Sequence, residues 1–117
     1  MSKAIMDLTE LLERVENDRE LMRDLLLIFK EEFPRHLQAL RDAVDSMDGE
    51  RVAAEAHTMK GMLSTLSATS AASAAARLEQ LGRNRKVCEF QEACASFENI
   101  SKKLLLQLDA CMAEVGG

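Results

Sequence analysis

Apolar residues recur every three or four positions along nearly the whole chain, which is the spacing of one buried face of an α-helix. Pro34 falls within the second such segment, and the apolar spacing continues beyond it, so we expect a kink there and not a helix end. The pattern predicts one short helix followed by four longer ones, at residues 2–17, 19–46, 50–67, 71–81 and 86–114.

Short polar residues stand at the predicted helix boundaries. Asp18 and Asp48 precede two of the helices and are expected N-caps, and Thr69 or Ser70 is expected to cap a third. Gly82 follows the fourth segment and suits the left-handed position that ends many helices.

The fold class follows from these elements. Strand-type runs of Val, Ile, Thr and aromatic residues are missing, and the long helices are joined by short connections. The sequence therefore predicts an all-α, antiparallel up-down four-helix bundle with a short additional N-terminal helix. A chain of 117 residues has the length of one domain, so we expect residues 1–117 to form a single domain.

The overall charge narrows the possible partners. A net charge of −5 disfavours a nucleic-acid interface and an anionic membrane surface. No apolar run is long enough for a membrane span, and the N-terminus has no signal-peptide core, so we expect no membrane insertion and a cytoplasmic protein. The three cysteines, Cys88, Cys94 and Cys111, lie among apolar helical positions; we expect reduced core thiols and no metal site.

The segment at residues 50–67 has an unusual outer face. Its predicted core stripe consists of Val52, Ala56, Met59, Leu63 and Leu66. His57 lies roughly 140° around the helix from Val52, at about 100° per residue, and so faces outward. Lys60 follows His57 by three positions on the same side.

Small residues surround this histidine. They are Ala53, Ala54, Gly61, Ser64 and Ala68. Gly61 in mid-helix costs about 1 kcal/mol relative to alanine, and close approach by a partner would explain that cost. A neutral imidazole is a nucleophile, and a lysine one turn away is within reach of oxygens on a phosphoryl group bound to it. These residues predict a phosphoacceptor histidine with clearance for a docking protein.

The sequence His-Thr-Met-Lys-Gly at residues 57–61 resembles the His-x-x-Lys-Gly signature of the histidine-containing phosphotransfer (HPt) domain. Residues 18–27 and 29–34 resemble the family's segment ahead of the phosphorylated helix, and Arg-Leu-Glu at 77–79 resembles the Leu-Glu that follows that helix. The resemblance covers roughly residues 5–112 and so nearly the whole chain.

This resemblance implies an intermediate in a His-Asp phosphorelay. His57 would accept a phosphoryl group from the aspartyl phosphate of a receiver domain, or from a kinase, and pass it to another receiver. Lys60 would orient the imidazole and its phosphate, and Gly61 would provide clearance. The domain would have no ATP site and no cofactor; Mg²⁺ would belong to the receiver. The implied partners are response-regulator receiver domains and a hybrid sensor histidine kinase, and we expect a monomer.

The chain departs from the family pattern in two ways. Ser67 stands where the family commonly has glycine, ten residues after the histidine, and Met62 and Leu63 stand where small residues are common. Leu63 lies on the core stripe, where its size does no harm. Met62 lies toward the side of the helix and could alter which receiver docks. Neither departure removes a reacting group.

Three other functions are weaker alternatives. A histidine-kinase dimerisation domain would need a nucleotide-binding domain, and the five scattered glycines form no phosphate-binding loop. A di-metal bundle would need several inward Glu-x-x-His pairs, whereas Glu55 and His57 lie on different sides of one helix. An inactive helical adaptor with the same fold is separated from a phosphotransfer protein only by chemistry. The second histidine, His36, has no Lys-Gly partner and is expected to be a partly exposed structural residue.

Overall fold

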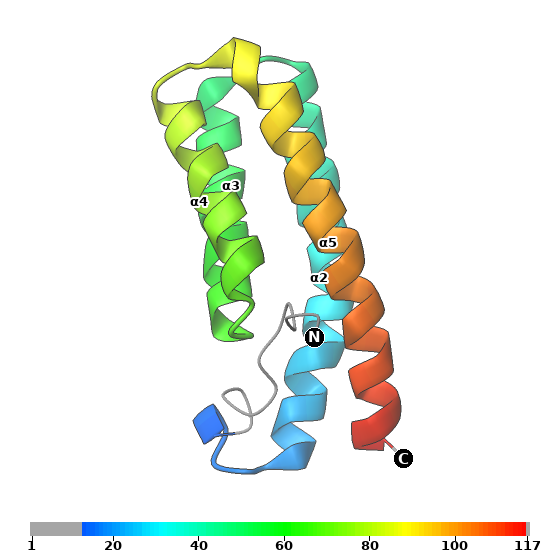
Figure 1. The fold of residues 1–117 in the computed structure, drawn as a ribbon. Helices are drawn as coiled ribbons and strands as arrows, with labels where there is room; N and C mark the ends of the chain where they lie inside the picture. The colour runs from blue at the N-terminus through cyan, green and yellow to red at the C-terminus, as the bar shows by residue number, and fades with distance from the viewer. Residues whose placement is uncertain (1–12, 117) are drawn as a thin grey trace.

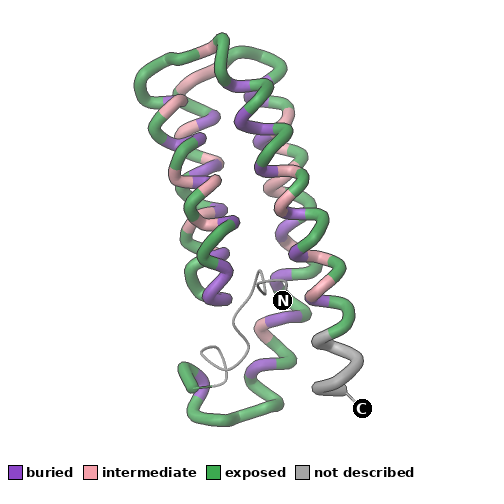
Figure 2. The backbone as a smooth tube through the Cα atoms, in the orientation of Figure 1, coloured by how far each residue is buried: buried purple, intermediate pink, exposed green. Residues whose placement is uncertain are grey.

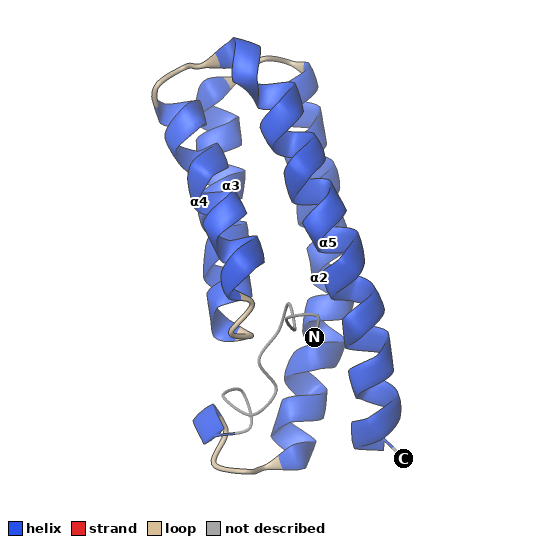
Figure 3. Ribbon diagram, viewed as in Figure 1, coloured by secondary structure: helices blue, strands red, loops and turns tan. Residues whose placement is uncertain are grey.

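The structure is a computed structural model that describes the backbone of residues 13–116 and the side chains of residues 13–110. Its long helices are α2 (Arg19–Asp45), α3 (Gly49–Thr65), α4 (Thr69–Arg83) and α5 (Val87–Gly116). They run alternately up and down, and the described residues contain no strand (Figures 1 and 3). The predicted all-α antiparallel bundle is confirmed. Of the predicted first helix, residues 13 and 14 are helical, and the rest lies outside the described residues apart from a turn at 15–17.

Each helix packs against two neighbours. The α3–α4 hairpin lies alongside the α2–α5 pair, with α3 against α2 and α4 against α5. At 1.5 Å per residue, the 17 residues of α3 extend for about 25 Å, whereas the 27 residues of α2 extend for about 40 Å. The α3–α4 turn therefore ends partway along the longer pair, as Figure 1 shows.

The two aspartate caps are confirmed. Asp18 accepts a hydrogen bond from the Leu21 amide at 3.0 Å, and Asp48 accepts one from the Arg51 amide at 3.2 Å. Each satisfies an amide that the first turn of its helix leaves without an intrahelical partner. Helix α2 continues through Pro34, as the apolar spacing predicted.

The predicted ends of α4 are wrong. The helix begins at Thr69 after an N-cap residue, Ala68, that has no capping side chain, so neither Thr69 nor Ser70 is the cap. Gly82 lies inside the helix, where a Cβ atom would come within 2.7 Å of the Ala53 nitrogen and the Gly49 oxygen. Gly82 therefore permits close packing of α4 on α3. The left-handed position after the helix is taken by Arg85, with φ 55°.

The core fills the space between the four helices. In Figure 2 the buried positions follow the inner side of each helix. All five residues of the stripe predicted for α3 are at most 2% exposed, which confirms that prediction. On α2 and α5, Phe33 and Phe97 are fully buried and their ring centroids lie 6.3 Å apart. Because the buried stripe of α3 faces the core, the opposite face of this helix is left for other contacts.

The cysteines differ in how far their side chains are buried. Cys94 is buried, as predicted, and this burial raises the pKa of its thiol. Cys88 is exposed near the start of α5, so its prediction as a core residue is wrong. Cys111 lies outside the residues whose side chains are described. Among the helices described, none is both long enough and apolar enough to span a membrane.

Candidate functional site

His57 stands on the outer face of α3. Its side chain is 64% exposed, whereas Ala56 and Met59 on the same helix are fully buried. The predicted exposure of this imidazole is therefore confirmed. The cause is helical geometry, because a residue one position after the core stripe is rotated about 100° away from it.

A buried carboxylate from α4 holds one side of the imidazole. Glu79 has a side chain that is only 4% exposed, and its Oε2 lies 3.0 Å from Nδ1 of His57. An ionised carboxylate only accepts hydrogen bonds, so the proton of the neutral ring is on Nδ1. The lone pair of the ring is then on Nε2. The contact therefore fixes both the tautomer and the orientation of the imidazole.

Two cations share the same carboxylate. Lys60 Nζ donates to Oε1 of Glu79 at 2.7 Å, and Arg83 Nη2 donates to Oε2 at 2.6 Å. The pKa of Glu79 is lowered from its ordinary value of 4.5, chiefly by the hydrogen bond from Lys60. The hydrogen bond from His57 and the charge of Arg83 lower it further, whereas burial of the carboxylate acts in the opposite direction. Glu79 is thus ionised at neutral pH. With one carboxylate and two cations, the cluster around the imidazole carries a net positive charge, which suits a bound phosphoryl group.

The small residues predicted around His57 differ in how far they are buried. Ala54, Gly61 and Ser64 are exposed, and a Cβ atom added at Gly61 would meet nothing within 4 Å. Ala53 is half-buried, because its backbone lies against Gly82 of α4. Ala68 is fully buried, so its prediction as an outward clearance residue is wrong.

The chain turns before Ala68 is reached. Helix α3 ends at Thr65, and Ser67 takes a left-handed conformation with φ 57°. The Ala68 amide bonds back to the Leu63 carbonyl at 2.9 Å, as in a Schellman motif. Helical spacing no longer applies after this turn, which directs Ala68 into the core. The same geometry explains why glycine would suit position 67.

An apolar pocket lies on the flank of this face. It is an open hollow of about 160 Å³ between α2 and α3, lined by Leu25, Ile28, Phe29, Met62, Thr65 and Leu66. Met62 is half-buried, which agrees with its predicted place at the side of the helix. The pocket begins five residues after His57 along α3 and gives the exposed face an apolar neighbour.

Comparison with known proteins identifies the family. The sequence model of the Hpt domain matches residues 24–116. The chain belongs to the Hpt domain family. No curated protein matches it at a significant level. Among solved structures, the crystal structure of histidine-containing phosphotransfer protein B (HptB) from Pseudomonas aeruginosa PAO1 is similar in fold, with a TM-score of 0.89 at 19% identity. That match covers 97% of this chain and 98% of HptB.

Membership of this family supports the role of a phosphotransfer carrier in two-component signalling. Hpt domains work with response regulators and kinases and are carriers, not independent enzymes. Among the described residues of this Hpt domain, no group of three or more His, Cys, Asp or Glu side chains is arranged to hold a metal ion.

Sequence reasoning missed two residues of this site. Glu79 was noted only as part of a family motif, and Arg83 was not among the predicted site residues. The available signal was their spacing, because residues 79 and 83 are one turn apart on a helix otherwise rich in alanine. Lys60 was expected to orient the imidazole and its phosphate, and in the structure its ammonium binds Glu79 of α4.

The second histidine of the Hpt domain is separate from this cluster. His36 on α2 lies 3.3 Å from Glu55 on α3, and both side chains are about a third exposed, at 32% and 30%. The prediction of a partly exposed residue is confirmed. His36 has no cation one turn away in the described contacts, unlike His57.

Proposed function

We propose that His57 is the phosphoacceptor of a His-Asp phosphorelay. It takes a phosphoryl group from the aspartyl phosphate of a receiver domain, or from a kinase, and passes that group to a second receiver. One observation carries this proposal: an exposed imidazole on α3 has its Nδ1 bound by the buried carboxylate of Glu79. The arrangement leaves Nε2 as the nucleophile.

The transfer requires one bond to form and one to break. The Nε2 lone pair attacks the phosphorus atom, the bond from phosphorus to the aspartyl oxygen breaks, and the aspartate leaves as a carboxylate. The proton on Nδ1 stays in place, so the phosphorylated ring is cationic at first. The carboxylate of Glu79, 3.0 Å from Nδ1, stabilises that charge. The same steps in reverse deliver the group to the next receiver.

Lys60 has two partners in this proposal. In the unmodified domain its ammonium is bound to Glu79 at 2.7 Å and is about a third exposed, at 36%. A phosphorylated histidine adds close to two negative charges one turn away. Because the lysine stem is flexible, its ammonium is then shared between Glu79 and the phosphoryl oxygens. Arg83 remains on Glu79 and keeps the carboxylate neutralised.

The exposed face around His57 is where the receiver docks in this proposal. Ala54, Gly61 and Ser64 present no bulk to a partner, and the apolar pocket beside Met62 offers a contact that excludes water. The receiver brings the aspartate and the Mg²⁺ ion, so this chain needs no cofactor of its own.

The experiment is phosphoryl transfer from a receiver that has been phosphorylated in advance. We expect the wild-type protein to acquire phosphate that is labile in acid and stable in alkali. His57→Gln should abolish the labelling, whereas His36→Gln, which removes the other histidine bound to a glutamate, should not. Both variants should keep the helical signal of the fold. If His57→Gln still labels, another residue accepts the phosphate and the proposal is wrong. If the wild type never labels with any receiver or kinase of its organism, the protein is an adaptor and the proposal is also wrong.

A further inference from the structure

Arg83 shares one oxygen atom of Glu79 with the phosphoacceptor ring. Its Nη2 lies 2.6 Å from Oε2, and Nδ1 of His57 lies 3.0 Å from the same atom, whereas Lys60 binds Oε1. The guanidinium and the ring are therefore within about 6 Å of each other, so the charge of one affects the protonation of the other even near the surface. Arg83 is the last residue of α4, and the close contact of Gly82 with α3 fixes this end of the helix.

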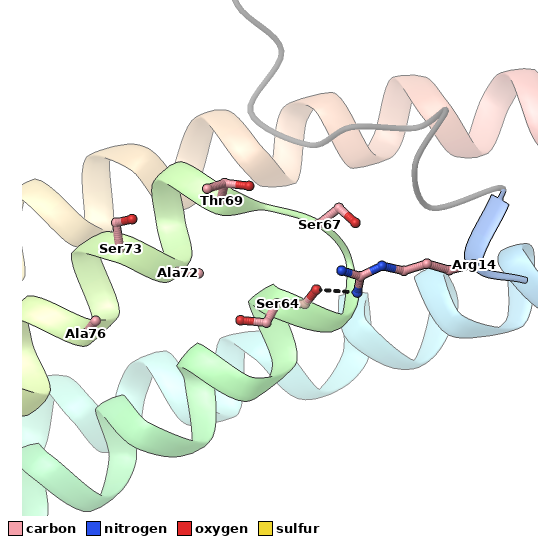
Figure 4. Close-up of a pocket in the computed structure, with 7 residues that line it drawn as sticks. All are labelled: Arg14, Ser64, Ser67, Thr69, Ala72, Ser73 and Ala76. Atoms are coloured by element: carbon pink, nitrogen blue, oxygen red, sulfur yellow. Dashed lines mark hydrogen bonds between the residues drawn. The ribbon is translucent and has the colours of Figure 1, made fainter.

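The charged groups that face Glu79 come from two helices. Among residues 13–110 they are Lys60 of α3 and Arg83 of α4, besides the imidazole. Arg14 lies at the other end of the helix pair, beside the α3–α4 turn, where it donates to the Ser64 carbonyl at 2.8 Å (Figure 4). In the proposed function Lys60 also binds the phosphoryl group. Arg83 is therefore the cation that stays on Glu79 after phosphorylation.

The lifetime of a phosphohistidine depends on the proton at its second nitrogen. When Nδ1 is protonated, the ring leaves phosphorus as neutral imidazole; without that proton it leaves as an anion, which is a far poorer leaving group. In hydrolysis, water adds to phosphorus, the electron pair of the P–Nε2 bond returns to Nε2, and phosphate departs as H₂PO₄⁻ while Nδ1 keeps its proton. A carboxylate at Nδ1 favours this reactive protonated form, and a cation bound to the carboxylate opposes it.

We propose that Arg83 is a positioning residue that prolongs the lifetime of phosphorylated His57. It acts through Glu79. By binding Oε2, it limits how strongly the carboxylate retains the Nδ1 proton once Lys60 is shared with the phosphoryl group. Phosphate is then lost to water more slowly, which leaves time for a receiver to dock. This inference rests on the proposed function, because it concerns the phosphorylated form of His57.

The test follows the decay of the phosphohistidine as a function of pH. The chain has two histidines, so a His36→Gln background leaves His57 as the only one. Phosphoramidate, a small phosphoryl donor, phosphorylates the ring without any receiver and is then removed. The rate of phosphate release is measured by ³¹P NMR between about pH 5 and about pH 9.

Arg83→Gln should displace the decay profile to higher pH by about half a unit, which is the effect of one solvated charge at about 6 Å. Phosphate should be lost about threefold faster above neutral pH. The rates should agree in acid, where the ring is protonated in both proteins. Arg83→Lys should restore the original profile, because it keeps a charge on Glu79. Arg77→Gln, which removes an exposed charge from the same helix, should leave the profile unchanged.

Three results would overturn this inference and leave the proposed function intact. The profile of Arg83→Gln could coincide with that of the parent protein. Its decay could be slower, which would place Arg83 on the phosphoryl group. Its decay could be faster by the same factor at every pH, which would indicate a looser structure and no change in ring protonation. The proposed function itself fails if a receiver leaves no phosphate on His57, and this inference then fails with it.

Discussion

The carboxylate of Glu79 is expected to hold the His57 imidazole in the orientation and tautomer that phosphotransfer needs, and Glu79→Gln tests this role. Glutamine keeps the size of the side chain but removes the charge that binds His57, Lys60 and Arg83. An amide oxygen still accepts a hydrogen bond from Nδ1, but more weakly, and its NH₂ group also competes as a donor. The amide therefore no longer enforces a single tautomer.

The contacts of Glu79 set the size of the expected effect. Charge-assisted hydrogen bonds contribute about 1.5–3 kcal/mol when well shielded. Lys60 and Arg83 are 36% and 59% exposed, so solvent reduces the value of each ion pair to about 1 kcal/mol or less. We expect Glu79→Gln to lower the free energy of unfolding by about 1–2 kcal/mol. The weaker bond to His57 should cost a further 1.4 kcal/mol or so in the transition state, which is about a tenfold slower transfer.

Two measurements separate these effects. Urea unfolding gives the change in stability, and single-turnover transfer from a phosphorylated receiver gives the rate for the folded variant. The ¹⁵N spectrum of the His57 ring at alkaline pH reports the tautomer. We expect the Nδ1-protonated form in the wild type and a mixture of tautomers in Glu79→Gln.

Glu79 does not position the imidazole if the variant transfers phosphate at the wild-type rate. A slower transfer with an unchanged ¹⁵N spectrum would also contradict the reasoning, because it would place the effect on Lys60 or Arg83. Arg83→Gln serves as the matched control, since it removes a charge from the same carboxylate without touching the ring.

The other predictions concern the same helix pair. Lys60→Ala should slow transfer several-fold with little loss of helical signal or thermal stability, because its side chain lies at the surface; an unchanged rate would remove it from the mechanism. Gly61→Ala should raise the free energy of unfolding by up to about 1 kcal/mol and yet slow transfer, because the added methyl is free of contacts until a receiver docks. Gly82→Ala should instead destabilise the fold by about 1–3 kcal/mol in urea unfolding, because its methyl would meet the backbone of α3. The pKa of Glu79 is lowered in the folded protein, so its carboxylate stabilises the fold only while it is ionised, and the free energy of unfolding should decline as pH falls below about 4.5. Urea midpoints measured between about pH 7 and pH 3 should show this decline in the wild type and a smaller decline in Glu79→Gln.

Local patterns predicted most of the fold. The three-four spacing located the core stripe of α3, and His57 was assigned to the outer face by rotation alone. Asp18 and Asp48 were recognised as caps because their bonds are made within three residues. These features depend only on residues that are close in the sequence, so they can be predicted from one sequence alone.

The features that were predicted wrongly or not at all have a different cause. Gly82 looked like a helix end, but its role depends on the backbone of Ala53 on another helix. Ala68 was placed by extending helical rotation past Thr65, where the helix ends. The burial of Glu79 depends on how α4 is aligned against α3. Each depends on packing between helices, which the pattern along one helix does not report.

The site of phosphorylation on the ring tests the central claim most directly. The protein would be labelled with ¹⁵N in its histidine rings, phosphorylated by a receiver, and held at alkaline pH for ¹⁵N and ³¹P NMR. Since Glu79 occupies Nδ1 of His57, we expect phosphorus coupled to Nε2 of that residue alone. Phosphate on Nδ1, on His36, or on no histidine would contradict the account.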